Sequence, residues 1–175
     1  LDLNTHYLDN EINTGASISV SGRVYISNLT ASMTAAQLSE LTNIPLLQLD
    51  GDISLDIASA QWKQGELPVA NGQINWTNAV VTVTEAASLG NVSIILSESE
   101  QDMQSAYITN KGGDITIVGN AELIPEQDYS VDLRMTPAAS ARNSIKQSLA
   151  MIAKRQSNGD YLLKNTGSLK TIGLM

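Results

Sequence analysis

A glycine followed by apolar residues two and four positions later recurs along most of the chain. The pattern starts at Gly22, Gly51, Gly72, Gly90, Gly113, Gly119 and Gly159. Apolar residues with a period of two line one face of a β-strand, and glycine adopts the turn or bulge conformations that other residues resist. We therefore expect a chain composed mostly of short strands, each with one buried face.

Turn-forming residues separate these segments at short intervals. They occur at Asn71 and Gly72, at 111–113 and at 158–160. Closely spaced strands joined by turns favour antiparallel pairing, because parallel strands need long crossover connections. The predicted fold is therefore mainly β, with a strongly curved antiparallel sheet. An open barrel and a sandwich are the alternatives.

The apolar alternation changes phase within one predicted strand. Before the change the apolar positions are Ile53, Leu55 and Ile57, and after it they are Ala58, Ala60 and Trp62. A one-residue slip moves side chains to the opposite face of a sheet, and a β-bulge accommodates it. We therefore predict a bulge near Ile57 and Ala58 that bends the sheet.

Two segments depart from the strand pattern and are predicted to be short helices. The first lies near 34–42, where the N-cap candidate Thr34 precedes good helix formers. The second lies near 140–154, with Ser140 as a candidate cap. One face of this second segment carries an apolar stripe formed by Ile145, Leu149 and Ile152. We expect that stripe to pack on the sheet.

The net charge of −8 combines two regions of opposite sign. Residues 1–133 hold seventeen acidic and three basic side chains, a net charge of −14, whereas residues 134–175 hold seven basic and one acidic, a net charge of +6. The acidic region would repel phosphate, which argues against nucleic-acid binding. The basic region could meet an anionic membrane surface, an acidic partner or the acidic region itself. An exposed basic face is predicted from Arg142, Lys146, Lys154 and Arg155.

Side chains that carry catalysis or bind metals are scarce. The chain has no cysteine and one histidine, His6, which excludes disulfides, thiolate zinc sites and cysteine nucleophiles. Segment 50–56 looks like a calcium loop but lacks the remaining ligands of an EF-hand, and we expect a solvated strand face there. No nucleophile elbow, P-loop or dinucleotide fingerprint occurs. We expect no catalytic residues, cofactor or metal, and we interpret Trp62 and Trp76 as core anchors.

The middle of the chain has a more specific order of motifs. A Gly-led strand is followed by a Leu-Pro turn, a Gly-x-x-x-Trp segment and two further Gly-led strands. The residues that form these motifs are Gly51, Leu67, Pro68, Gly72, Trp76, Gly113 and Gly119. Over roughly residues 15–170 this order resembles the periplasmic region of type II secretion system protein N, also called general secretion pathway protein N.

The resemblance implies a non-enzymatic accessory or assembly component of the type II protein secretion system. It implies a location at the periplasmic face of the Gram-negative inner membrane. Partners would be the inner-membrane platform proteins and the secretin. Contact with inner-membrane headgroups is a separate expectation, which rests on the predicted basic face. Members of this family carry one N-terminal membrane helix. Residues 1–175 are therefore interpreted as a single periplasmic β-rich domain, a fragment without its anchor.

An alternative function is a carrier of lipid or another apolar ligand, held in a groove of the curved sheet. The concave face of the sheet distinguishes the two functions. A face filled by side chains and by the 140–154 helix favours an interaction protein, in which a partner segment adds as a strand to an unpaired sheet edge. An open apolar trough favours the carrier.

Overall fold

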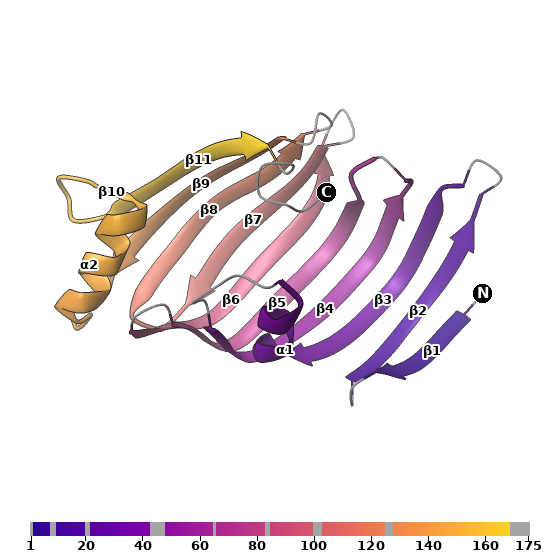
Figure 1. The fold of residues 1–175 in the computed structure, drawn as a ribbon, viewed down its shortest axis with the longest axis horizontal. Helices are drawn as coiled ribbons and strands as arrows, with labels where there is room; N and C mark the ends of the chain where they lie inside the picture. The colour runs from indigo at the N-terminus through magenta and orange to yellow at the C-terminus, as the bar shows by residue number, and fades with distance from the viewer. Residues whose placement is uncertain are drawn as a thin grey trace.

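The fold is an open, strongly curved antiparallel sheet with two short helices (Figure 1). The computed structural model describes residues 2–7, 10–19, 22–42, 48–64, 66–82, 85–99, 103–124 and 128–168. The strands are β1 (Asp2–Tyr7), β2 (Asn10–Ile18), β3 (Val24–Thr34), β4 (Gln48–Trp62), β5 (Val69–Thr82), β6 (Ala86–Ser99), β7 (Met103–Lys111), β8 (Ile115–Ile124), β9 (Asp128–Pro137), β10 (Lys154–Arg155) and β11 (Tyr161–Ser168). The helices are α1 (Ala35–Thr42) and α2 (Asn143–Ile152).

The strands follow the order of the chain from β1 to β9 and end with β11 and then β10. All pairings in the described residues are antiparallel, and none joins β1 to β10. The predicted fold class, a curved antiparallel sheet with two short helices, is therefore confirmed. The strands form one sheet that does not close into a barrel, so the structure has the curved-sheet form of this prediction and not the sandwich.

The strands are longer than the sequence pattern predicts. β4 has 15 residues, and β5 and β6 have 14 each. Asn71 and Gly72, predicted as a turn, lie inside β5. The predicted turn at 158–160 lies between β10 and β11, and the one at 111–113 starts at the last residue of β7 and leads to β8. A glycine of this pattern therefore need not mark the start of a strand. Inside a strand, as at Gly72, it marks a close approach of the neighbouring backbone or a bulge.

The predicted bulge in β4 is confirmed. In the pairing of β4 with β5, Ile57 lies opposite Gly72 and Ser59 lies opposite Asn71, so Ala58 has no partner residue. A second register shift occurs between Asp50 and Asp52. Extra residues of this kind bend a strand and increase its twist, and they contribute to the curvature of the sheet.

Two of the motif glycines are required for different reasons. Gly72 has no unusual backbone angle, but a Cβ there would lie 2.7 Å from the Cα of Ile57 and closer still to the Asp56 carbonyl oxygen. Gly113 has φ +84°, and its Cβ would lie 2.5 Å from the Ser88 carbonyl oxygen. Neither position accommodates a side chain without movement of the backbone.

Helix α1 begins with the predicted cap. The backbone N–H of Gln37 donates to the Thr34 hydroxyl at 3.4 Å, and the Thr34 N–H donates to the Gln37 side-chain oxygen at 3.0 Å. This reciprocal pair is a capping box with glutamine at its third helical position. The pattern read from the sequence therefore places this helix correctly.

The main core lies where α2 packs on the concave face of the sheet. Ile145 and Leu149 are 3% and 4% exposed. The buried sheet residues of this cluster are Ala79, Leu89, Val92, Ile115, Met135 and Tyr161. Two expectations fail here. The N-cap of α2 is Arg142 and no side chain bonds to the helix start, so the prediction that Ser140 caps this helix is wrong. Ile152, the third member of the predicted stripe, is 60% exposed because α2 ends there, and the chain turns into β10.

The two tryptophans differ in their environments. Trp76 packs partly buried against the main core, and its indole N–H donates to the Asp50 carbonyl oxygen at 2.9 Å. Trp62 is 47% exposed at the end of β4. The expectation of a core anchor therefore holds for Trp76 and is wrong for Trp62.

Candidate functional site

The concave face carries an apolar row that crosses eight strands. Each member lies directly opposite the next in the sheet register. From β3 to β11 the row is Ala31, Leu55, Ile74, Ile94, Ile108, Gly119, Leu133 and Leu163. With strands about 4.8 Å apart, the row spans roughly 34 Å. We call it the trough floor.

The neighbouring row, one residue along each strand, faces the convex side and is mainly polar. From β3 to β11 it is Thr30, Asp56, Gln73, Ile95, Tyr107, Asn120, Asp132 and Lys164. Lys164 forms an ion pair with Asp132 at 2.6 Å. An antiparallel sheet with one polar and one apolar face has water on its polar side, here the convex one. Its apolar side, here the concave one, packs against other apolar groups.

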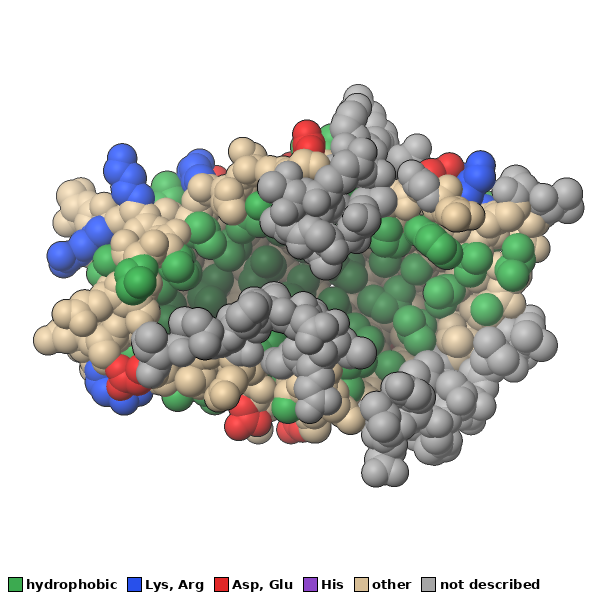
Figure 2. Space-filling view, in the orientation of Figure 1, with side chains coloured by type: hydrophobic (Ala, Val, Ile, Leu, Met, Phe, Trp, Pro, Cys, Tyr) green, Lys and Arg blue, Asp and Glu red, His purple; other side chains and the backbone are tan. Residues whose placement is uncertain are grey.

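The concave side forms a hollow lined by hydrophobic side chains. Figure 2 shows them as a green band along the length of the molecule, between two rims that carry the charged groups. Helix α2 crosses the hollow only at the end formed by the C-terminal strands (Figure 1). Floor residues Leu55 and Ile74 are only half-buried. Among the described residues, α2 therefore fills one end of this concave face, and an apolar trough whose floor is partly covered continues beyond it, with Ala31 buried.

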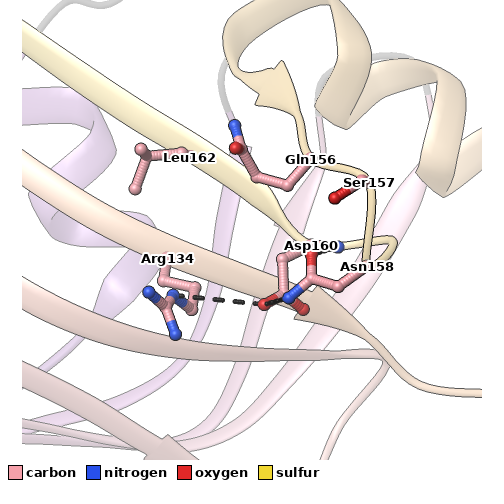
Figure 3. Close-up of a pocket in the computed structure, with 6 residues that line it drawn as sticks. All are labelled: Arg134, Gln156, Ser157, Asn158, Asp160 and Leu162. Atoms are coloured by element: carbon pink, nitrogen blue, oxygen red, sulfur yellow. Dashed lines mark hydrogen bonds and ion pairs between the residues drawn. The ribbon is translucent and has the colours of Figure 1, made fainter.

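A shallow cleft of about 240 Å³ lies on the edge of the sheet between β9 and β11, lined by Arg134, Gln156, Ser157, Asn158, Asp160 and Leu162 (Figure 3). The Asp160 carboxylate accepts hydrogen bonds from Thr136 Oγ1 at 2.8 Å and from Asn158 Nδ2 at 2.9 Å. Arg134 Nε lies 4.0 Å from Asp160 Oδ2. The Asp160 carboxylate therefore already bonds to side chains of the turn and of β9. We interpret this cleft as a structural contact between the turn and the sheet.

The four residues of the predicted basic face do not form one set. Arg142 forms an ion pair with Glu85, and its Nη2 donates to the Ala86 carbonyl oxygen at 2.9 Å. Lys146 and Arg155 both line a second cleft of about 240 Å³, separate from the one in Figure 3. Lys154 is exposed on β10. In the described part of the chain Arg142 is the only one of the four with an ion pair.

The seven predicted motif residues have structural positions. Gly51 lies at the β4 register shift, and Leu67 and Pro68 lie in the connection to β5. Gly72 and Trp76 lie in β5, Gly113 precedes β8, and Gly119 is part of the trough floor. Gly119 is thus both a motif residue and a floor residue. A Cβ at this position would collide with the Asp132 carbonyl oxygen, so a side chain does not fit there.

The acidic side chains of the described residues are dispersed. These residues contain no group of three histidine, cysteine or acidic side chains placed to hold a metal ion. Asp52, Ser54 and Asp56 of the calcium-like segment are exposed along β4, as the solvated-face interpretation expects. Neither described helix has the length and apolarity needed to cross a bilayer.

Sequence reasoning missed the trough floor and the exposed pair Met151 and Ile152, which are 85% and 60% exposed. The alternation of apolar and polar residues in each strand predicts which residues share a face. It does not predict which residues of neighbouring strands lie opposite one another. The exposed pair has a signal in its position, since only Ala153 separates it from Lys154 and Arg155.

Comparison with known proteins gives one match. The family model described as type II secretion system (T2SS), protein N, matches residues 2–164 of the 175 residues. Searches of the curated proteins and of the solved structures return no significant match. The matched range runs from β1 into β11 and includes the whole trough floor.

Proposed function

Because the chain belongs to the type II secretion system protein N family, we propose that it is a non-enzymatic accessory or assembly component of that system. It acts through protein–protein contacts in the periplasm. Family membership makes it a secretion-system component of the Gram-negative envelope and implies contacts with other components of the same machine. The inner-membrane platform proteins and the secretin are the partners we propose.

We place residues 1–175 as one unit at the periplasmic face of the inner membrane. The mainly polar convex face and the acidic net charge of residues 1–133 suit an aqueous compartment. The full-length protein is proposed to carry one N-terminal membrane helix. Protease added to spheroplasts should digest these residues, whereas protection until the inner membrane is broken would contradict the assignment.

The outer edge of β11 supplies a physical mode for a partner. β11 pairs with β9 over all eight of its residues, but β10 covers only Tyr161 and Leu162. Within the described residues, the edge from Leu163 to Ser168 has no strand beside it. Unpaired backbone groups along such an edge accept an added strand from another chain.

A site-specific photo-crosslinker tests this proposal in cells that assemble the secretion system. Placed at Thr166, on the β11 edge, it should give adducts that contain a platform protein or the secretin. The control is the same crosslinker at Asn120, which is exposed in the middle of the convex face. Equal adducts from both positions, or none from Thr166, would contradict strand addition at β11.

The apolar trough favours a second candidate, a carrier of lipid or another apolar ligand. Its support is the apolar row across eight strands, which α2 covers at only one end. Exposing a continuous apolar surface of this length to water is costly, and lipid acyl chains would remove that cost.

Native mass spectrometry after gentle purification tests the second candidate. Wild-type protein should carry bound lipid, and Leu55→Asp should lose it because a carboxylate then stands on the floor. The matched control is Ser54→Asp, which places the same charge on the neighbouring residue but on the exposed convex face. A wild-type protein with no bound lipid would rule out the carrier and leave the interaction function standing.

A further inference from the structure

The last turn of α2 presents apolar side chains that the sheet does not cover. Ile145 and Leu149 anchor the helix on the sheet, whereas Met151 and Ile152 are 85% and 60% exposed. Met151 is the most exposed large apolar residue in the described part of the chain. The backbone N–H of Ala153 bonds to the Leu149 carbonyl oxygen, so the exposed pair is part of an ordered helix end.

Three cations lie near this pair in the chain, in α2 and in β10. After Ala153, Lys154 and Arg155 form β10, both exposed, and Lys146 lines a cleft with Arg155 and Asp160. No acidic residue occurs between positions 138 and 159. None of these three cations forms an ion pair with another described residue. Figure 2 shows several blue side chains around the α2 end of the molecule.

We propose that the α2 tip, defined as Lys146, Met151, Ile152, Lys154 and Arg155, docks on an anionic phospholipid bilayer. Met151 and Ile152 enter the boundary between headgroups and acyl chains, and the cations lie at the phosphates. An exposed apolar wedge flanked by lysine and arginine matches the two layers of a bilayer surface, apolar below and anionic above. A soluble acidic protein would match the cations but would leave the wedge in water.

The tip is separate from the two proposed functional surfaces. The β11 edge and the trough floor do not include its residues, and Arg142 is excluded because it is paired with Glu85. The docking proposal can therefore fail while the secretion-system and carrier proposals stand, and the reverse also holds. α2 itself stays on the sheet, because Ile145 and Leu149 are buried there.

Co-sedimentation of the purified chain with vesicles tests the proposal. The chain should bind phosphatidylcholine vesicles that contain roughly one third phosphatidylglycerol, bind pure phosphatidylcholine weakly, and release at high salt. Lys154→Glu should lower the partition coefficient at least about fivefold, since each cation near an anionic surface contributes appreciably. Met151→Ser should lower it by about threefold.

Two matched variants make the result specific to the tip. Lys111→Glu makes the same charge change at an exposed strand end, and Ile18→Ser makes a comparable apolar-to-polar change at a residue 74% exposed. Both should bind like the wild type. Equal losses in the tip and control variants would overturn the proposal. So would binding to immobilised polyglutamate with no binding to the anionic vesicles, which would assign the surface to an acidic protein.

Discussion

Arg142 forms an ion pair with Glu85, 57 positions earlier in the chain, and thereby ties the start of α2 to the connection between β5 and β6. The same guanidinium donates to the backbone carbonyl oxygen of Ala86. The basic region at the C-terminal end therefore does contact the acidic region, as one of the sequence-based interpretations holds. Of the described cations in this basic region, those without an ion pair are Lys146, Lys154 and Arg155 of the α2 tip.

Reversing this pair should affect stability. Arg142→Glu is expected to lower the free energy of unfolding by about 1 kcal/mol, because Arg142 is more than half exposed and water screens the pair. Arg142→Glu combined with Glu85→Arg should recover much of the loss in urea denaturation. Additive losses in the double variant would show that the two side chains do not interact in solution.

Substitutions at the two adjacent glycines before β8 should distinguish the cost of the left-handed backbone conformation from the cost of steric crowding. Gly112 and Gly113 both have φ +84°, but a Cβ at Gly112 has nothing within 4 Å, whereas one at Gly113 would meet the Ser88 carbonyl oxygen. Gly112→Ala should cost about 1 kcal/mol from the left-handed conformation alone. Gly113→Ala should cost clearly more in thermal or urea unfolding. Equal costs would mean that the backbone opens to accept the methyl group.

The anchoring of α2 can be tested at a buried and an exposed position of the same helix. Leu149→Ala should destabilise the protein by about 2–4 kcal/mol, because it leaves a cavity in the main core. Met151→Ala, at a residue 85% exposed, should leave the urea midpoint nearly unchanged. A small effect at Leu149 would indicate that α2 leaves the sheet in solution.

The two tryptophans provide an optical test, since the chain has no others. Trp62→Phe leaves the partly buried Trp76, so its fluorescence maximum should lie at the shorter wavelength. Trp76→Phe leaves the half-exposed Trp62, with emission at longer wavelength, and should lose about 1 kcal/mol with the hydrogen bond to Asp50. Identical emission from the two variants would argue against the different burial described here.

Local chemistry made much of the fold predictable. The period-two alternation gives strands, Thr34 marks the start of α1, and the phase change at Ile57 locates the Ala58 bulge. Each of these depends on residues within a few positions of one another. The same kind of reasoning failed at Asn71 and Gly72, where a turn-like pair lies inside β5 because the Asp56 backbone passes too close for a side chain.

The burial of single side chains was less predictable, because it depends on whether another element of the fold packs against them. Ile152 continues the stripe of Leu149, and Trp62 continues an apolar alternation, yet both lie at the ends of their elements and are exposed. The trough floor was out of reach for a related reason. Its row from Ala31 to Leu163 results from seven successive registers, and one unrecognised bulge would move part of it to the convex face.

The consecutive pairing of β1 through β9 has an evolutionary consequence. In such a meander, duplication of one hairpin inserts two neighbouring strands without rerouting the rest of the chain. Each event would extend the hollow face by about 10 Å, or shorten it by the same step on deletion. Relatives of different length are therefore expected to differ by whole hairpins, with the helix-bearing terminus kept as a common end piece. The length of the concave face would then change in evolution by whole hairpins.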